Sequence, residues 1–288
     1  MTRGELIEEL AASLGARHEA RFIVEEVLGP RPSHGGDVGT AEIDAARAQA
    51  TRRRDDEPLQ YILGHWAFRT LDLLVDDRVL IPRPETEQVV EVALREVRRL
   101  QTPAPFMVDA GTGSAAIALS LAIELSDCYP EGRVWATDAS AAALTVARAN
   151  LDRVRIPCSR TVLPLTFVEG SWLSALPPEL KGALDLIVSN PPYVAAGEWP
   201  DLPADVRQEP KEALVARDGT DGTPGLRDVE DVLSEAWTWL SRPGVVVIEL
   251  APAQADAAAA VARAMGYDDV GIEMDLAQRP RALVGRVG

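Results

Sequence analysis

Apolar residues follow two different spacings along the chain. In the first 50 or so residues they recur at helical spacing. They predict three helices, over residues 6–14, 20–28 and 43–50. The Gly- and Pro-rich stretch GPRPSHGGDVG, at 29–39, is predicted to be a loop between them. The next apolar segment, PLQYILGHWAFRTLDLLVDDRVLIP, predicts short strands in a hairpin, with Gly64 as its turn.

From about residue 85 onward, apolar runs alternate with segments of helical spacing. The runs predict strands at 105–110, 133–138, 165–170, 184–190, 244–250 and 281–287. The segments between them predict helices at 85–100, 115–125, 141–151, 225–240 and 253–266. This alternation is typical of a mainly parallel sheet covered by helices on both faces. Ligands bind such sheets at the carboxyl ends of the strands, so residues directly after each strand are the candidates for a site.

The pattern therefore predicts an α/β protein in three parts. These are a small helical domain (1–58), a β-hairpin connector (59–84) and a large α/β domain (85–288). A chain of 288 residues with 47% hydrophobic content is long enough to bury the cores of one large and one small domain.

Charge and hydropathy narrow the class of partner. The chain has 29 basic and 45 acidic residues, and its net charge of −16 argues against a broad basic surface for nucleic acid phosphates, although a local patch is left open. No apolar run approaches the roughly 18 to 20 residues of a membrane span, and the start, MTRGELIEELAASLG, has the pattern of an amphipathic helix and not of a signal peptide. The expected location is the cytoplasm.

The cysteines and histidines form no ligand pattern. Cys128 and Cys158 have no CxxC spacing, so we expect plain thiols. His18, His34 and His65 are scattered and have no neighbouring ligands. The sequence predicts neither a metal site nor a histidine base.

Two strand ends in the α/β part carry acidic residues. Asp109 closes the first strand, and Gly111 and Gly113 then open a tight turn into a helix, where backbone N–H groups can approach a ligand closely. Asp138 ends the second strand, 25 residues after Gly113, where a carboxylate can accept hydrogen bonds from both hydroxyls of a ribose. Helix capping is the alternative role for Asp138, but Ser140 is the nearer cap. We therefore favour a nucleoside ligand.

The segment IVSNPPYVAAG (187–197) places an amide, two prolines and an aromatic ring at the end of the fourth strand. Neither proline has an N–H to donate, but their carbonyls stay free, so Asn190 and its neighbours form a rigid set of acceptors beside the flat face of Tyr193. A Pro-stiffened loop without function is the alternative reading. A dinucleotide oxidoreductase is a second alternative, since the loop GTGSAA satisfies G-x-G-x-x-G/A with Ala116. The two acidic strand ends together with NPPY resemble the pattern of S-adenosylmethionine-dependent methyltransferases that act on a planar nitrogen.

From Tyr61 onward the chain resembles the HemK/PrmC family, the protein-(glutamine-N5) methyltransferases of peptide chain release factors. The matching motifs are PLQYILGHWAF, VLIPRPETE, VDAGTGSAAIALSLA, VEGSWLSAL, DLIVSNPPYV, EPKEALVARDGTDG, GLRDV, IELAPAQADAAAAVARAMGY and DLAQRPRALVGR. NPPY is shared with adenine-N6 methyltransferases of DNA and ribosomal RNA, so PRPETE and EPKEAL carry the narrower identification. Residues 1–60 match the family only in helical character and length.

The resemblance implies a Rossmann-like class I methyltransferase fold with a seven-stranded sheet, and S-adenosyl-L-methionine as the cofactor, with S-adenosyl-L-homocysteine as its product. It implies that Asp138 holds the ribose and that Trp172 neighbours the adenine, with core packing as the alternative for Trp172. The remaining cofactor contacts implied are Asp109, Gly111, Thr112, Gly113, Ser114, Ala115 and Asn190.

The resemblance also implies a substrate and a catalytic set. The substrate is a class I release factor, docked by the helical domain so that its Gly-Gly-Gln loop enters the site. Asn190, Pro191 and Tyr193 are the expected catalytic residues, and Pro192 joins them in binding substrate. The Asn190 oxygen and the Pro191 carbonyl would each accept one N–H of the glutamine amide, and Tyr193 would stack on it. We expect a monomer with no nucleic acid or membrane partner.

Two departures from the family pattern concern the cofactor site. Ala115 stands where the family commonly has glycine, and its methyl group is tolerable there if φ is negative. Glu249 leads into LAPAQ, where the family usually has a glycine soon after the glutamate.

Two further segments are expected near the substrate. Glu85 and Glu87 are candidates to cap the first helix of the large domain or to line the substrate mouth, without a catalytic role. Glu209 and Pro210 are expected to shape the connection over 194–223, which is too long for a simple turn and predicts a lid or a substrate wall.

Three other functions stay open at this point. A nucleic acid adenine-N6 methyltransferase would need a basic groove and room for a flipped base. A non-catalytic module of this fold would bind the cofactor without turnover. A methyltransferase acting on another protein or on a small molecule is the third.

Overall fold

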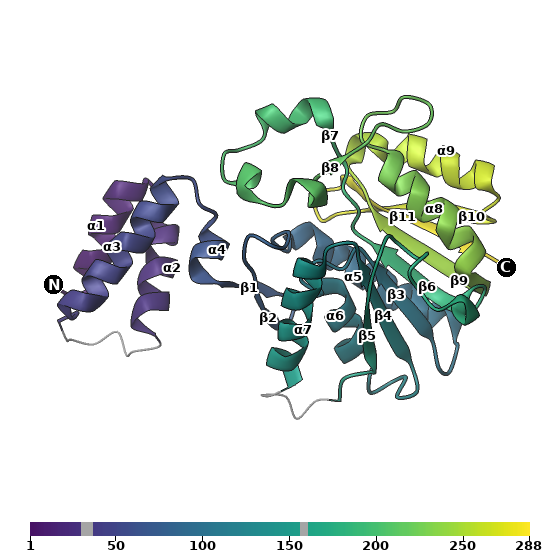
Figure 1. Cartoon of the computed structure of the whole chain (residues 1–288), viewed down its shortest axis with the longest axis horizontal. Helices are drawn as coiled ribbons and strands as arrows, with labels where there is room; N and C mark the ends of the chain where they lie inside the picture. The colour runs from purple at the N-terminus through teal and green to yellow at the C-terminus, as the bar shows by residue number, and fades with distance from the viewer. Residues whose placement is uncertain (30–36, 156–160) are drawn as a thin grey trace.

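The computed structural model describes residues 1–29, 37–155 and 161–288. At the N-terminus, α1 (Arg3–Leu14), α2 (Arg17–Leu28) and α3 (Thr40–Arg54) pack around an apolar core of their own, seen at the left of Figure 1. The three predicted helices are confirmed, and each begins three residues earlier than predicted because polar first turns leave no apolar signal. Most of the loop predicted at 29–39 lies outside the described residues.

The hairpin connector is confirmed, but its turn is not at Gly64. The strands β1 (His65–Phe68) and β2 (Leu71–Leu74) pair antiparallel, so the chain turns between them, where Arg69 has a φ of 51°. Gly64 instead ends the short helix α4 (Leu59–Leu63), with a φ of 77° and its N–H donated to the carbonyl of Gln60. The apolar run before Gly64 is short enough to fit either a strand or one helical turn, and its spacing therefore could not show that it is helical.

A single seven-stranded sheet forms the body of the protein, in the order β10-β11-β9-β6-β3-β4-β5. Its strands are β3 (Phe106–Ala110), β4 (Arg133–Asp138), β5 (Leu165–Glu169), β6 (Leu184–Ser189), β9 (Leu240–Glu249), β10 (Asp269–Met274) and β11 (Pro280–Val287). β11 runs antiparallel to both of its neighbours, β9 and β10, and the other pairs of the sheet are parallel. The sheet confirms the predicted fold class, and β10 is the strand that the apolar runs did not mark. It is a half-exposed edge strand with polar residues, so it has no apolar run.

Helices cover both faces of this sheet (Figure 1). The helices α5 (Pro84–Leu100), α6 (Ala116–Glu124) and α7 (Ala141–Arg155) cover one face, and α8 (Arg227–Trp239) and α9 (Ala255–Met265) cover the other. Successive strand residues point to opposite faces, so Met107 packs into the first layer and Val108 into the second. The strand order changes direction at β3, and the carboxyl ends of β6, β3 and β4 therefore meet beside one another.

The connection after β6 forms a structure of its own above these strand ends (Figure 1). Two short strands, β7 (Val194–Ala195) and β8 (Val215–Ala216), pair in parallel. Between them lie the 3-10 helices η2 (Ala196–Asp201), η3 (Val206–Gln208) and η4 (Lys211–Ala213), while η1 (Pro178–Leu180) and η5 (Pro252–Gln254) lie elsewhere in the fold. No helix in the described ranges is long and apolar enough to cross a membrane.

Candidate functional site

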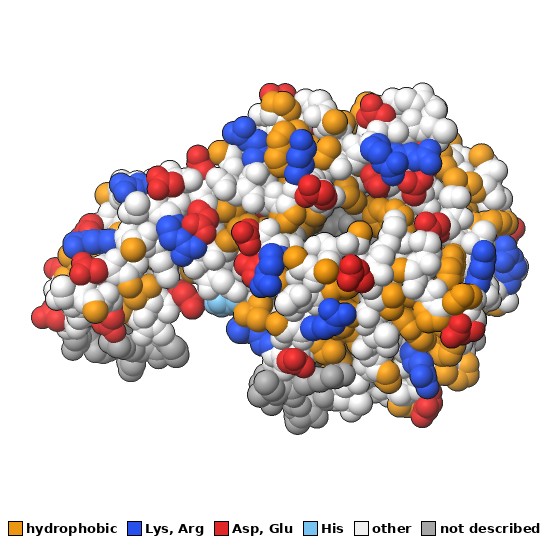
Figure 2. Space-filling view, in the orientation of Figure 1, with side chains coloured by type: hydrophobic (Ala, Val, Ile, Leu, Met, Phe, Trp, Pro, Cys, Tyr) orange, Lys and Arg blue, Asp and Glu red, His pale blue; other side chains and the backbone are white. Residues whose placement is uncertain are grey.

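A cavity of about 540 Å³ opens at the carboxyl ends of β3, β4 and β6, and Figure 2 shows the surface hollowed beneath the segment that follows β6. The sequence-predicted residues on its lining are Gly111, Gly113, Asp138, Trp172, Asn190, Pro192 and Pro210. The connector adds Arg78 and Val79, so the hairpin region forms part of the wall. Pro210, Glu212 and Ala213 also line it, so the connection over 194–223 forms part of the cavity wall, and its role toward substrate stays a prediction.

Asp138 ends β4 with its carboxylate at the cavity. Its Oδ2 accepts a hydrogen bond from the N–H of Gly113 at 2.8 Å, and its Oδ1 accepts one from the N–H of Ser140 at 2.8 Å. Ser140 caps α7, since its Oγ accepts from the N–H of Ala143 at 3.1 Å, as predicted. Burial raises the pKa of Asp138, and the two N–H groups oppose that rise. Each oxygen keeps a further lone pair that a ligand hydroxyl can use.

Trp172 lies against the glycine loop. Gly111 has a φ of 77°, and a Cβ atom built there would lie 3.1 Å from the Trp172 ring, so only glycine lets the ring approach so closely. Trp172 is half-buried, packs on the apolar core and lines the cavity as well. The core contact and the ligand contact considered for this residue are therefore compatible.

Asp109 lies beneath the loop and not on the cavity lining. Its Oδ2 accepts from Thr112 Oγ1 at 2.6 Å and from the N–H of Ala118 at 3.0 Å, and its Oδ1 is buried with no hydrogen-bond partner among the residues described. Burial raises the pKa of Asp109 to about 7, and repulsion from Asp138 adds to the rise. Thr112 and Ser114 are also buried, so these three residues shape the loop from below.

The condition under which Ala115 would be tolerated without strain, a negative φ, is not met. The φ of Ala115 is 67°, the left-handed region, and its methyl group is fully buried. The tight turn requires this conformation, because the N–H of Ala115 donates to the carbonyl of Thr112 at 2.8 Å immediately before α6 begins. A side chain in this region costs about 1–2 kcal/mol, so the departure from glycine is a strained one.

Ala115→Gly is therefore expected to change the free energy of unfolding by less than about 1 kcal/mol, since relief of strain offsets the lost burial of a methyl group. Ala122→Gly, on a buried alanine inside α6, is the matched control and is expected to cost about 2 kcal/mol because nothing offsets it. Urea unfolding of both variants measures the difference. Equal costs would show that Ala115 is not strained.

Asn190 directly follows β6 and turns its amide between α5 and the cavity. Its Nδ2 lies 3.3 Å from Thr86 Oγ1, to which it donates. Its Oδ1 is buried and has no hydrogen-bond partner in the described part of the chain. A buried acceptor without a partner is costly unless a ligand supplies the donor. Thr86 was not singled out from the sequence, although it is the threonine of PRPETE.

The backbone after Asn190 is held by a side chain from η5, the segment that follows β9. Pro191 is buried and Tyr193 is half-buried, and burial raises the pKa of Tyr193 to about 12. Gln254 Nε2 donates to the carbonyls of Tyr193 and Pro224, both at 3.0 Å. Gln254 is the last residue of LAPAQ, so the segment that departs from the family pattern holds NPPY in place. No local signal in the sequence marks this long-range contact.

Gly225→Ala is expected to disrupt this contact between Gln254 and Tyr193. Gly225 has a φ of 65°, and a Cβ there would lie 2.5 Å from the carbonyl oxygen of Tyr193 and 3.0 Å from Gln254 Nε2. Overpacking and backbone strain together predict a loss of about 2–3 kcal/mol in the free energy of unfolding. Gly222→Ala is the control, because Gly222 also has a positive φ, of 86°, but has open space around it. Equal losses in thermal unfolding would contradict the steric argument.

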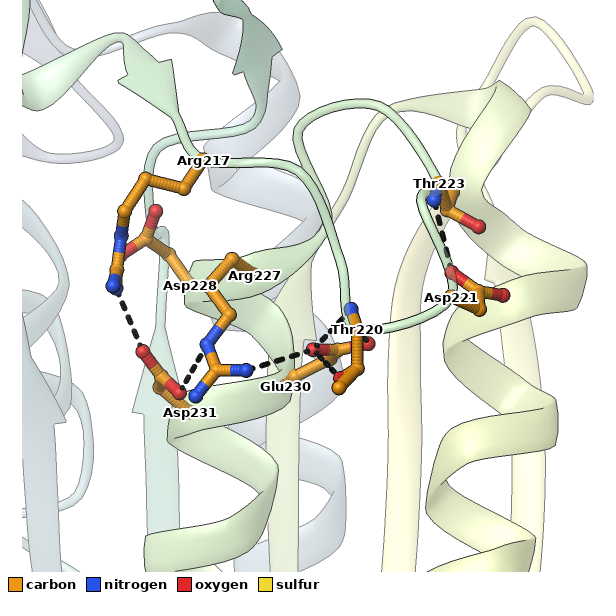
Figure 3. Close-up of polar contacts among 8 residues, drawn as sticks. All are labelled: Arg217, Thr220, Asp221, Thr223, Arg227, Asp228, Glu230 and Asp231. Carbon is orange, nitrogen blue, oxygen red and sulfur yellow. Dashed lines mark hydrogen bonds and ion pairs between the residues drawn. The ribbon is translucent and has the colours of Figure 1, made fainter.

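A polar network fixes the loop that carries Gly225 (Figure 3). The Glu230 carboxylate accepts the Thr220 N–H at 3.0 Å and the Thr220 hydroxyl at 2.5 Å. Arg217, which lines the cavity, donates to Asp231 at 2.8 Å. Because Glu230 and Asp231 belong to the first turns of α8, they fasten the first part of the loop, at Arg217 and Thr220, to that helix.

Glu209 joins the two most specific motifs. It is buried, its Oε2 accepts the N–H of Ile81 at 2.9 Å, and its Oε1 pairs with Arg83. Burial raises the pKa of Glu209, and Arg83 opposes the rise. PRPETE and EPKEAL are therefore in direct contact, and Glu209 shapes the wall as predicted.

Glu85 and Glu87 do not line the cavity. Glu85 lies 3.7 Å from Arg279, and Glu87 accepts the backbone N–H of Arg69 at 2.9 Å. Both carboxylates thus hold neighbouring segments against the start of α5.

The cysteines and histidines lie away from the cavity lining where they are described. Cys128 and His18 are exposed, and the two ring nitrogens of His65 bond to carboxylates at 2.5 and 3.0 Å. Cys158 and His34 lie outside the described residues. Within the described ranges, no cluster of three His, Cys, Asp or Glu side chains could hold a metal ion.

Comparison with solved structures identifies the fold. A methyltransferase from Pyrococcus furiosus superposes with a TM-score of 0.52 at 17% identity, over 84% of this chain and 98% of its own. The hMettl16 catalytic domain, solved in complex with the MAT2A 3'UTR hairpin 6, gives a TM-score of 0.54 at 15% identity, over 85% of this chain and 81% of its own. At these identities the likeness concerns the fold alone.

Comparison with known sequences goes further. The family model of the methyltransferase small domain matches residues 97–214. The release factor glutamine methyltransferase of Moorella thermoacetica is 38% identical in an alignment of 293 positions that covers 98% of this chain and 95% of that protein. That of Burkholderia pseudomallei is 38% identical in an alignment of 247 positions that covers 84% of this chain and 82% of that protein. With such relatives aligned along nearly its whole length, the chain belongs to the release factor glutamine methyltransferase family.

Proposed function

We propose that the protein transfers a methyl group from S-adenosyl-L-methionine to the side-chain amide nitrogen (N5) of the glutamine in the Gly-Gly-Gln motif of class I peptide chain release factors. The names of its relatives support this activity. The single observation that carries the chemistry is the Asn190 oxygen, a buried acceptor without a protein partner among the described residues, on a residue that lines the cavity.

An amide nitrogen is a poor nucleophile because its lone pair is delocalised into the carbonyl. Asn190 Oδ1 and the Pro191 carbonyl would each accept one N–H of the substrate amide, which holds the nitrogen in line with the methyl group and stabilises the positive charge that develops on it. Tyr193 would stack on the amide plane, and Pro192 would close the substrate side. When bound, the cofactor supplies an electrophilic sulfonium methyl group. The amide nitrogen would take this methyl group, leaving the thioether S-adenosyl-L-homocysteine, and would then release its extra proton to water.

The residues around the cavity fit the cofactor. The Asp138 carboxylate lines the cavity and has lone pairs left for two ribose hydroxyls, and the Trp172 ring offers an apolar surface for adenine. The methionine end would lie on the loop formed by Gly111, Thr112, Gly113, Ser114 and Ala115. Asp109 supports this loop from beneath, and Asn190 borders both ligands.

The same proposal extends to partner and location. The helical domain at 1–58 would dock the release factor, the connector would span 59–84, and the catalytic domain would span 85–288. Acidic and basic side chains are interspersed on the face shown in Figure 2, which supports a protein substrate over nucleic acid. A monomer in the cytoplasm, without a membrane partner, completes the proposal.

The test is transfer of labelled methyl from S-adenosylmethionine to a purified class I release factor. The control is the same factor with the glutamine of its Gly-Gly-Gln motif changed to alanine. We expect label on the first factor and none on the second. Label on neither, with cofactor bound, would overturn the proposal, and transfer to DNA or RNA offered in parallel would identify an adenine methyltransferase instead.

A further inference from the structure

The amide of Asn190 serves as an acceptor only while its oxygen faces the substrate. Turned by 180°, the same side chain would present N–H groups, and a substrate amide would meet donors in place of a lone pair. In the structure Nδ2 lies 3.3 Å from Thr86 Oγ1, and Oδ1 has no partner among the described residues. The orientation of the amide therefore depends on what Thr86 offers it.

A threonine hydroxyl has one proton and two lone pairs, so by itself it can meet either end of an amide. Thr86 is buried in the first turn of α5, and Glu249, whose pKa the Thr86 hydroxyl lowers, is fully buried at the end of β9. An ionised carboxylate has lone pairs only, so toward the Thr86 hydroxyl it can act only as the acceptor of the single proton. Thr86 Oγ1 is then left as an acceptor, and Nδ2 is the end of the Asn190 amide that can meet it.

The ionisation and the surroundings of the Glu249 carboxyl support this series of contacts from Glu249 through Thr86 to Asn190. Burial raises the pKa of Glu249 to about 7, whereas the Thr86 hydroxyl and the Arg281 guanidinium lower it. Arg281 is itself buried, with Nη1 3.9 Å from Glu249 Oε1. The Thr86 hydroxyl lies near enough to lower the pKa of the carboxyl by hydrogen bonding. The contact is looser than an ordinary hydrogen bond, and no other group among the residues described hydrogen-bonds to either Glu249 oxygen. The carboxylate therefore has lone pairs available for the hydroxyl proton, and at pH 8 it is mostly ionised.

We propose that Thr86 and Glu249 are positioning residues that hold the Asn190 amide with its oxygen toward the substrate. The inference rests on the proposed function, because the orientation matters only for a substrate that brings N–H groups to the cavity. Neither residue would touch the substrate, since each acts through Asn190. The threonine of PRPETE and the glutamate before LAPAQ thereby acquire one shared role.

Kinetics at pH 8 test the role of the hydroxyl. Thr86→Val keeps the branched shape and removes the hydroxyl, while Thr86→Ser keeps the hydroxyl. We expect Thr86→Val to lower kcat between about tenfold and a hundredfold, with KM for the release factor within about threefold of wild type. Thr86→Ser is expected to keep kcat within about threefold of wild type. Equal kcat in the two variants, or a loss confined to KM, would overturn the proposal.

Glu249→Gln tests whether the Glu249 carboxylate sets the direction of the hydrogen bond that the Thr86 hydroxyl donates. The glutamine amide can both donate and accept, so it no longer forces the Thr86 proton toward itself. We expect kcat to fall about tenfold while thermal unfolding stays cooperative. Wild-type kcat in this variant would show that the carboxylate does not direct the chain of hydrogen bonds.

A measurement without substrate separates this inference from the proposed function. The side-chain amide protons of Asn190, followed by ¹⁵N nuclear magnetic resonance, are expected to exchange with solvent about tenfold faster in Thr86→Val than in wild type or Thr86→Ser. If wild-type protein labels no release factor, the proposed function fails, yet this comparison still decides the positioning role. Unchanged exchange in Thr86→Val would overturn it.

Discussion

Asn190→Ala is expected to lower kcat for release factor methylation about a thousandfold, while the Kd for S-adenosylmethionine stays within about threefold of wild type. The side-chain oxygen is needed most in the transition state, when positive charge develops on the amide nitrogen. Loss of an interaction made mainly in the transition state appears in kcat and not in ground-state binding. Each tenfold in rate corresponds to about 1.4 kcal/mol, so the expected loss is about 4 kcal/mol.

Single-turnover kinetics and calorimetric titration of the cofactor measure the two quantities separately. Thermal unfolding provides the control for the fold, because Asn190 also bonds to Thr86 and its loss leaves the buried Thr86 hydroxyl with one partner fewer. Turnover equal to that of wild type would refute the role of Asn190. A parallel loss of cofactor affinity would move that role from the methyl transfer to the binding of the cofactor.

Asp109→Asn is expected to change how stability depends on pH. Burial raises the pKa of Asp109 to about 7, above the value of about 3.9 for an unfolded chain. The stability contributed by the raised pKa is fully present below about pH 4 and is lost as pH rises through 7. Asparagine does not titrate, so the variant does not lose this stability. Between pH 4 and pH 8, its free energy of unfolding should rise by about 3 to 4 kcal/mol relative to that of wild type.

Urea unfolding of both proteins at pH 4, 6 and 8, without cofactor, gives the difference in free energy of unfolding between variant and wild type at each pH. Any destabilisation by the new amide group that does not depend on pH cancels when these differences are compared. Glu249, whose pKa burial also raises to about 7, is present in both proteins and cancels as well. A difference that stays the same from pH 4 to pH 8 would mean that Asp109 titrates alike in the folded and unfolded states.

Features that the sequence predicted well depend on local spacing. Apolar runs and helical periodicity marked six strands of the sheet, and the strand-end rule pointed to Asp138 and Asn190, which the fold brings to one cavity. The sequence did not predict strand β10, because an edge strand needs no apolar run. It did not predict the positive φ of Ala115 either, because alanine, unlike glycine, does not indicate a left-handed turn.

Contacts between distant segments lay beyond such reasoning. Thr86 meets Asn190 across 104 residues, and Gln254 meets Tyr193 across 61. Neither Thr86 nor Gln254 stands out in its own segment of the sequence, because its role depends on a contact that only the three-dimensional fold creates. The resemblance to a known family marked PRPETE, but only the fold shows that its threonine supports the NPPY amide.

The position of β11 in the sheet bears on the order of synthesis and folding. β11 (Pro280–Val287) is inserted between β9 and β10, both of which precede it in the chain. Until it emerges from the ribosome, β9 has an unpaired edge, β10 has no neighbour in the sheet, and Arg281 is missing beside Glu249. Nascent chains fold from the N-terminus onward, so the sheet is completed only when β11, the seventh of its strands in chain order, has emerged. A chain cut short before residue 280 would thus leave a hydrophobic strand edge open to aggregation.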